Sequence, residues 1–383
     1  MSLKMEMQEE ILSVLYNNTT KPKALPFNLI RKHDKTLAKQ GDFSFPDPGN
    51  TKAWKSELDT ENLQENFTNI KLISRVVKGP KFWIVFLNRT ETIERLFQHS
   101  SSTSKVIAGS SYKVGCPDNV NGDLTSARAA FFAEILENCA AQVHVQDLKG
   151  FYISTAGSNI DKMDTSVHQT ILVGPVLGSD GKKATLTMNE YRDIVRERIE
   201  ALDAERSEDG ESIQVRDRRL EALTSAEVRL SLISSNAISE TSLPDAGYSS
   251  ATFIMYNSAR VAQILASFDA SVQRGVYPAL PASVDWSLLN EEEEWEICFN
   301  YLLPYQDLLQ ETVGPLRKLH GLPLHLAGLS KSLSRYYSRV KILRDPLPNL
   351  IPVIHARIRF LEVIQAHICS SLAILGLSQL KKM

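Results

Sequence analysis

The sequence lacks the short motifs by which many enzymes are recognised. It has no GxSxG nucleophile elbow, no GxxxxGK[ST] phosphate loop, no HExxH zinc motif and no GxGxxG dinucleotide loop. These motifs are the usual signals of many hydrolases, nucleotidases, zinc peptidases and dinucleotide-dependent oxidoreductases. The residue pattern therefore predicts neither a catalytic site nor a cofactor.

Paired cysteines and excess charge are also missing. The four cysteines, Cys116, Cys139, Cys298 and Cys369, lie far apart and form no CxxC pair. This spacing predicts reduced thiols in an intracellular protein, without a disulfide framework or a zinc site. The net charge is −2, so a nucleic-acid-binding surface would have to be a local basic patch.

Long hydrophobic runs are absent as well. No segment approaches the roughly 20 apolar residues of a membrane span. The first residues, MSLKMEMQEEILSVL, are too acidic and too weakly apolar for a signal peptide. We therefore expect a cytoplasmic protein, and its 383 residues are enough for two or three domains.

The hydrophobic pattern divides the chain into three regions. Residues 1–112 predict a small α+β domain in which strands at 70–78 and 81–89 form a hairpin. Residues 113–210 predict a reduced α/β element, a Rossmann-like remnant too short for a full doubly wound sheet. Residues 211–383 predict an all-α bundle. The further elements expected are helices at 5–18, 28–40, 92–100, 124–142 and 189–202, strands at 141–147 and 168–176, a flexible junction at 204–219, and helices at 225–238, 249–268, 289–305, 329–345 and 353–377.

Two isolated features have a functional and a structural interpretation. His168 precedes a predicted strand as a possible ligand or base, although an isolated histidine is more often structural. Glu291 to Glu294 form an acidic run that would suit a metal. Acidic residues are also common at the positive end of a helix dipole, and we favour this second interpretation.

The segment LSKSLSRYYSRVKILRD, residues 329–345, is the strongest candidate for a binding surface. Lys331, Arg335 and Arg339 recur every fourth residue, opposite an apolar stripe, and the pair Tyr336-Tyr337 lies among them. Aromatic rings beside cations suit base stacking along a phosphate backbone. A solvated helix face is the alternative interpretation, but Asp345 is the only acidic residue between Leu329 and Arg359.

Several stretches resemble arginyl-tRNA synthetases. HLAGLSKSLSRYYSRVKIL and ARIRFLEVIQAHICSSLAILGLSQLKKM resemble the DALR anticodon-binding domain that ends these enzymes, and FIMYNSARVAQIL is similar to the helix that opens it. ISRVVKGPKFWIVFLNRTETIERLF resembles their N-terminal domain, which contacts the tRNA elbow. GDLTSARAAFFAEILENCAAQVHV and VHQTILVGPVLGSDGKKATLT are similar to the two nucleotide-binding signatures.

The chain departs from the synthetases at both signatures. The HIGH position, whose histidines bind ATP phosphates, reads Asp123-Leu124-Thr125-Ser126, and KMSKS becomes Lys183-Ala184-Thr185-Leu186-Thr187. The stretch between Val143 and His168 is also much shorter than an amino-acid pocket requires. The chain is thus similar to the DALR anticodon-binding-domain-containing protein 3 family. This resemblance implies a non-catalytic adaptor that recognises arginine tRNAs and helps a partner methyltransferase form 3-methylcytidine in the anticodon loop.

Candidate tRNA-binding residues come from the pattern and the resemblance together. We expect the cations to contact phosphates. We expect one tyrosine of the pair to stack on an unpaired base and the other to belong to the core. A frayed C-terminus is the alternative interpretation for Met383. The candidates are Lys331, Arg335, Tyr336, Tyr337, Arg339, Lys341, Arg344, Tyr256, Asn257, Arg260, Arg357, Arg359 and Met383. Two alternative functions remain open: a protein-interaction scaffold that no longer binds tRNA, and a residual enzyme.

Overall fold

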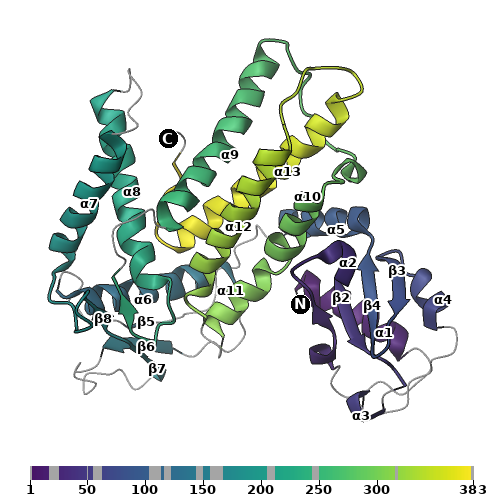
Figure 1. Cartoon of the computed structure of the whole chain (residues 1–383), viewed down its shortest axis with the longest axis horizontal. Helices are drawn as coiled ribbons and strands as arrows, with labels where there is room; N and C mark the ends of the chain where they lie inside the picture. The colour runs from purple at the N-terminus through teal and green to yellow at the C-terminus, as the bar shows by residue number, and fades with distance from the viewer. Residues whose placement is uncertain are drawn as a thin grey trace. The chain divides into compact units, whose positions relative to one another are not determined.

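Figure 1 shows the computed structural model of the chain, which divides into two compact units. Unit 1 comprises Met1–Lys105, Leu280–Asp307 and Arg344–Arg359, and unit 2 comprises Val106–Ala279, Leu308–Leu343 and Phe360–Met383. The predicted boundaries of three consecutive domains, at 112 and 210, stay a prediction. The structure describes residues 2–16, 26–49, 51–54, 63–102, 114–115, 122–143, 150–155, 167–204, 212–243, 250–314 and 318–380.

Unit 1 is built around an antiparallel sheet of strand order β1-β2-β4-β3. Its strands are β1 (Arg31–Lys32), β2 (Phe43–Pro46), β3 (Ile73–Lys78) and β4 (Phe82–Leu87); its helices are α1 (Leu3–Leu15), α2 (Leu37–Gln40), α3 (Thr51–Trp54), α4 (Leu63–Thr68), α5 (Arg89–Ser102) and α10 (Glu292–Ile297). Trp83, Val85 and Leu87 are buried, whereas Phe82 is 52% exposed, so alternation along β4 sends one side of the strand into the core. The predicted β3–β4 hairpin is confirmed.

The helix predicted at 28–40 is wrong. This stretch contains β1, paired with β2, and only the single turn of α2. Gly41 follows α2 with φ of +76°, and a side chain there would meet Ile84 and the backbone of Val85. The chain therefore turns sharply into β2, and strand pairing outweighs the helical pattern of the sequence.

Polar contacts tie α10 and the residues after it to the sheet within unit 1. The indole nitrogen of Trp295 donates to Asp42 Oδ1 at 2.9 Å, and Lys32 Nζ donates to Asn300 Oδ1 at 2.8 Å. The Phe43 and Phe299 rings also meet edge to face, 5.5 Å apart. The amino-terminal α+β fold and residues 280–307 thus share one core.

Unit 2 contains the parallel element expected from the strand-helix-strand pattern. Strands β5 (Val114–Gly115), β6 (Gly150–Thr155) and β7 (Val167–Val173) form a parallel sheet, and α6 (Leu124–Gln142) packs on it. The strand predicted at 141–147 is wrong where the structure describes it, because Ala141 and Gln142 end α6; residues 144–149 lie outside the described residues. A second, two-stranded parallel sheet joins β8 (Val176–Leu177) to β9 (Thr241–Ser242).

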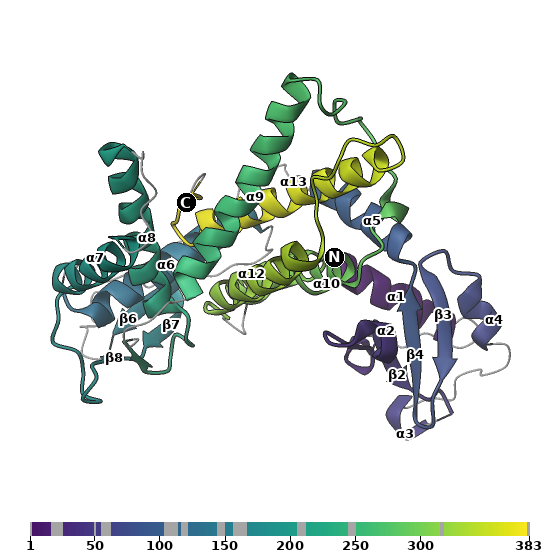
Figure 2. The ribbon, with the colours of Figure 1, turned by 45° about the horizontal axis from the view of Figure 1, so that its top comes forward.

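The rest of unit 2 is helical, as predicted for the C-terminal region. Its helices are α7 (Met188–Ala204), α8 (Ile213–Ile233), α9 (Ser250–Gln273), α11 (Tyr305–Val313), α12 (Gly321–Arg339) and α13 (Ile351–Ile374); α11 and α13 begin in unit 1. Helices α9, α12 and α13 lie side by side (Figures 1 and 2). The flexible junction expected at 204–219 is wrong from Ile213 onward, because Arg216 and Arg219 both pair with Asp203 of α7.

The structure ends α13 at Ile374, close to the predicted end at residue 377. Gly376 has φ of +66°, the left-handed conformation that commonly ends helices. Within the described part of the chain, no helix combines the length and the apolar content needed to cross a membrane.

Candidate nucleic-acid interface

One side of α12 lies in the core of unit 2. Leu322, Leu326, Leu329 and Leu333 are at most 1% exposed. Tyr336 continues this stripe at 0% exposure and packs edge to face on Phe360 of α13, with ring centroids 6.2 Å apart. Tyr336 is therefore the core tyrosine of the pair, and its side chain has no surface to offer an RNA base.

The other side of α12 is exposed and basic. Lys331, Arg335 and Arg339 are all exposed, and Lys341 is exposed just beyond the end of the helix. Arg335 Nη2 donates to Ser332 Oγ at 3.1 Å, which holds its stem against the helix. The sequence has no acidic residue between Glu311 and Asp345, so this stretch of a chain of net charge −2 carries positive charge alone.

Tyr337 connects this basic side to α9. The Arg260 guanidinium lies over the Tyr337 ring, 4.9 Å from its centroid, a cation–π contact between the two helices. Burial raises the pKa of the Tyr337 hydroxyl, which keeps it neutral, and this hydroxyl has no hydrogen-bond partner among the described residues. Tyr256 lies one turn before Arg260 and is 47% exposed, so an aromatic ring stands on the same side of α9.

These residues form what we call the α9–α12 surface. It belongs entirely to unit 2 and combines cations with one exposed aromatic side chain. Its members are Tyr256, Arg260, Lys331, Arg335, Tyr337, Arg339 and Lys341.

The remaining candidates are placed differently. Asn257 is 1% exposed, and its amide donates to the Phe253 carbonyl at 2.9 Å within α9, so we remove it from the surface. Arg344 is exposed but belongs to unit 1, as do Arg357 and Arg359. Arg359 is half-buried and donates to the Pro281 carbonyl. Met383 lies outside the described residues.

Arg357 pairs with the acidic run in the interior of unit 1. Its Nε donates to Glu294 Oε1 at 2.8 Å, and both side chains are at most 4% exposed. Because this ion pair occupies the guanidinium, we remove Arg357 from the predicted tRNA contacts. Glu294 also accepts the Glu291 amide at 3.0 Å, which confirms the helix-start interpretation of the acidic run. No group of three or more metal-ligating side chains occurs in the described ranges; the His168 side chain lies outside them.

No pattern in the sequence indicates the contacts that anchor the C-terminal tail. Gln379 Nε2 donates to the Ser258 carbonyl of α9 at 3.1 Å, and Gln379 Oε1 accepts from Gln365 and from the Cys369 thiol of α13. Gln379 thereby fixes the tail between two helices. A polar residue after a helix stop gives no pattern from which this anchoring can be predicted.

The two segments similar to nucleotide-binding signatures meet in unit 2. Asp123 caps α6 by accepting the Ser126 amide at 2.8 Å, and Lys183 Nζ donates to Asp123 Oδ2 at 2.6 Å. Burial raises the pKa of Asp123, but the bonds from Lys183 and Ser126 outweigh it, so the pKa lies below its ordinary value. A charged carboxylate thus covers the helix end where an anion would otherwise bind.

Arg128, which lies in the first of these two segments, is fully buried. Its guanidinium donates to the carbonyls of Gly174, Leu232, Asn236 and Ser239 and to the Ser235 hydroxyl, at 2.7–2.8 Å. Burial lowers its pKa to about 10. Arg128 therefore holds α6 to the ends of β7 and α8 and presents no charge to solvent.

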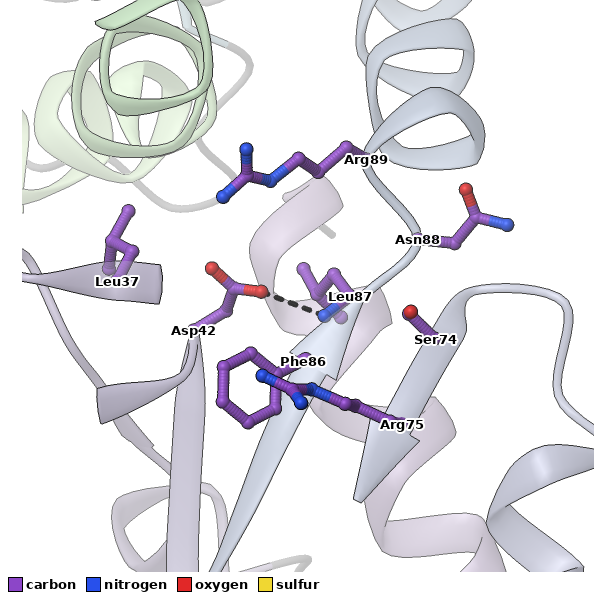
Figure 3. A pocket seen from close by; sticks show the side chains of 8 residues that line it. All are labelled: Leu37, Asp42, Ser74, Arg75, Phe86, Leu87, Asn88 and Arg89. Carbon is purple, nitrogen blue, oxygen red and sulfur yellow. Dashed lines mark hydrogen bonds between the residues drawn. The ribbon is translucent and has the colours of Figure 1, made fainter. Parts of the chain in front are cut away.

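Unit 1 contains a pocket of about 310 Å³, lined by residues of α2, β3 and β4 and by the start of α5 (Figure 3). The Arg75 guanidinium lies over the Phe86 ring, 3.9 Å from its centroid. Asp42 also lines the pocket and accepts the Leu87 amide at 2.7 Å (Figure 3). Burial raises the pKa of Asp42 to about 6, although its hydrogen bonds from Leu87 and Trp295 oppose the shift. The pocket thus combines an arginine, an aromatic ring and a carboxyl group that titrates near neutrality.

Comparison with known proteins identifies the C-terminal part of the chain. Residues 254–383 match the family described as DALR anticodon binding domain. The chain is 36% identical over 154 residues to DALR anticodon-binding domain-containing protein 3 of Rattus norvegicus, covering 37% of this chain and 28% of that protein. It is 30% identical over 235 residues to the protein of the same name from Danio rerio, covering 56% of this chain and 41% of that protein. The chain therefore spans less than half the length of these curated relatives.

Solved structures identify the fold. Thermus thermophilus arginyl-tRNA synthetase matches with a TM-score of 0.66 at 10% identity, covering 100% of both chains. Plasmodium falciparum arginyl-tRNA synthetase matches with a TM-score of 0.60 at 9% identity, covering 98% of this chain and 99% of the other. The chain thus has an arginyl-tRNA synthetase-like fold that ends in a DALR anticodon binding domain, and the predicted fold class is confirmed.

Proposed function

We propose that this chain, whose C-terminal part is a DALR anticodon binding domain, is a non-catalytic adaptor that binds arginine tRNAs. It would present them to a partner methyltransferase that forms 3-methylcytidine in the anticodon loop. The observation that carries the proposal is the α9–α12 surface inside a domain of the anticodon-binding family. The proposal assigns recognition to this chain and the chemistry to the partner.

The composition of the surface suits an anticodon stem-loop. Lys331, Arg335 and Arg339 project from successive turns of α12, with a rise of about 6 Å from one to the next. This spacing is close to that of successive phosphates in a nucleic-acid strand. Tyr256 is the exposed aromatic side chain of the surface and supplies a ring on which an unpaired base stacks. Arg260 over Tyr337 holds the neighbouring part of α9 in place.

Unit 1 supplies the proposed contact with the tRNA elbow. The pocket lined by Arg75 and Phe86 presents a cation and an aromatic ring. Arg75, Lys78 and Lys81 are exposed on the β3–β4 hairpin. Arg75 and Phe86 are paired in the register of β3 and β4, so this side of the sheet can hold a looped-out base against Phe86 while Arg75 contacts its backbone.

The absence of aminoacylation is part of the same proposal. In a synthetase the two signatures bind ATP. In this chain the corresponding residues Asp123 and Lys183 form an ion pair with each other. Asp123 would repel a triphosphate, and Lys183 would have to leave its carboxylate to bind one. We expect no arginine-dependent exchange of pyrophosphate into ATP, and measurable exchange would establish the residual-enzyme alternative.

Charge reversal tests tRNA binding. We expect Arg335→Glu with Arg339→Glu to abolish binding of arginine tRNA transcripts, measured by fluorescence anisotropy, without changing the far-UV circular dichroism. Arg218→Glu with Lys182→Glu is the matched control, since both residues are exposed cations of unit 2 outside the DALR domain. Equal affinities of the wild type and the Arg335/Arg339 variant would refute the assignment of the surface.

Recovery from cells tests the adaptor role. RNA and protein partners that co-purify with the tagged chain should include arginine tRNAs and a methyltransferase, and 3-methylcytidine in those tRNAs should fall when the chain is depleted. Recovery of a methyltransferase from both the wild type and the charge-reversed variant, without tRNA, would favour the scaffold alternative.

A further inference from the structure

The basic side of α12 contains a serine that stands apart from its neighbours. The segment from Ser330 to Ser338 has four serines, and three of them are wholly or partly buried. Ser330 is 3% exposed, Ser332 is 1% exposed and Ser334 is half-buried. Ser338 is the exposed one, so it is the serine of this segment that another protein can reach.

Ser338 lies among cations at the end of the helix. Arg335 precedes it by three residues and Arg339 follows it directly, and both are exposed. The Ser338 hydroxyl donates to the Arg335 carbonyl at 2.7 Å, which places it along the same side of α12 as Arg335. Arginine three residues before an exposed serine is the feature that many protein kinases of basic specificity recognise in their substrates.

The position also makes the serine accessible to such a kinase. α12 ends at Arg339, and the last bond of its ladder is Val340 N to Tyr336 O at 2.8 Å. Residues after Val340 are extended or turn-like, and helix ends open more readily than helix centres. A short opening of this last turn would free Ser338 and leave Tyr336 and the buried leucines of α12 in the core.

We propose that Ser338 is a phosphorylation site that switches off the α9–α12 surface. In the reaction, Ser338 Oγ attacks the γ-phosphorus of ATP on a protein-serine kinase, and an Oγ–P bond forms as the bond to the bridging β–γ oxygen breaks. The hydroxyl proton passes to the base of the kinase, and ADP leaves. This inference rests on the proposed tRNA binding, since it concerns regulation of the same surface.

The effect follows from charge. A phosphoserine carries about −1.5 to −2 charges at neutral pH and three strong acceptor oxygens. It would pair with Arg335 and Arg339, which flank it, and would remove about half of the positive charge supplied by Lys331, Arg335, Arg339 and Lys341. A phosphate at a helix C-terminus is unfavourable by itself, so this pairing with the arginines is what stabilises it. The same arginines are then no longer available to RNA phosphates.

The first experiment tests modification of the folded chain. The full chain is incubated with ATP and calmodulin-dependent protein kinase II, which requires arginine three residues before the serine, and phosphorylated residues are mapped by mass spectrometry. We expect phosphate on Ser338, its loss in Ser338→Ala, and strong reduction in Arg335→Gln. Phosphorylation of a peptide spanning 329–345 but not of residue 338 in the folded chain would overturn the proposal, and so would failure of both substrates.

The second experiment tests the switch. The full chain with phosphoserine incorporated at 338 during translation should bind arginine tRNA at least about tenfold more weakly than wild type, because it has lost about two phosphate contacts. Ser338→Asn should bind as wild type, since it adds bulk without charge. Unchanged affinity of the phosphorylated chain would overturn the inference alone, provided that Arg335→Glu with Arg339→Glu has lost binding. If that double variant also binds normally, the proposed function fails as well.

Discussion

The salt dependence of tRNA binding measures how many cations of the α9–α12 surface contact phosphates. The perturbation is Arg335→Gln with Arg339→Gln, which removes two charges but keeps long polar side chains. Both residues are exposed on α12, so neither substitution opens a cavity, and the amide of glutamine can still donate a hydrogen bond where Arg335 donates to Ser332. The fold should therefore be retained and any change in binding should report the contacts themselves.

The expected magnitude comes from counterion release. With Lys331, Arg335, Arg339 and Lys341 all on phosphates, the logarithm of affinity should fall with the logarithm of salt at a slope of about −2.8 to −3.6. From about 50 to about 200 mM salt, affinity would then fall roughly 50- to 150-fold. The double variant should keep a slope of about −1.4 to −1.8, which corresponds to a fall of roughly 7- to 12-fold over the same range.

Fluorescence anisotropy of a labelled arginine tRNA across this salt range measures both slopes. Arg218→Gln with Lys182→Gln, two exposed cations of unit 2 outside the DALR domain, should leave the slope of the wild type unchanged. If the Arg335/Arg339 variant has the slope of the wild type, its lost affinity has another cause, and the assignment of phosphate contacts to α12 is refuted.

Three further predictions concern stability. Gly376→Ala should destabilise the chain by about 1–2 kcal/mol in urea titrations, because alanine disfavours φ of +66° and its Cβ would lie 2.8 Å from Arg229 Cζ; full stability would contradict the tight helix end. Asp123→Ala should cost about 1 kcal/mol at pH 7 by loss of the α6 cap, and because the folded pKa of Asp123 is lowered, the cost should disappear as pH falls through that pKa. His325 and His367 face each other with Nε2 atoms 2.9 Å apart, and burial lowers the pKa of His325 to about 4 and that of His367 well below its ordinary value. The unfolded chain therefore binds more protons, so the free energy of unfolding should fall as pH drops from about 6.5 to about 4. His325→Phe should reduce this dependence in acid titrations followed by far-UV circular dichroism, which reports on the helices of unit 2.

Much of the fold follows from periodicity in the sequence. The cores of α6, α9, α12 and α13 carry apolar residues at helical spacing, and the structure buries those stripes. The β3–β4 hairpin follows from two apolar runs around Gly79-Pro80. These elements are predictable because the pattern that selects the local structure also selects the buried face.

The elements that sequence reasoning missed depend on partners far along the chain. The first turns of α8 are polar enough to read as a linker, but Arg216 and Arg219 share Asp203 of α7 as a partner. The stretch at 28–40 has a helical pattern in the sequence. In the structure, however, β1 pairs with β2, and β2 pairs with β4. In both cases the local propensity is weak and a tertiary contact decides the structure.

The candidate site shows the same division at the level of single side chains. The fourfold spacing of Lys331, Arg335 and Arg339 predicts one basic side of a helix, and all three are exposed on α12. Spacing does not reveal which cations have interior partners, and Arg357 lies against Glu294, 63 residues away in sequence. A cation near an apolar helix is therefore an RNA-contact candidate only until its acidic partners are known. Ser338 shows the same limit: its position between Arg335 and Arg339 is visible in the sequence, but only the structure shows that its side chain is exposed.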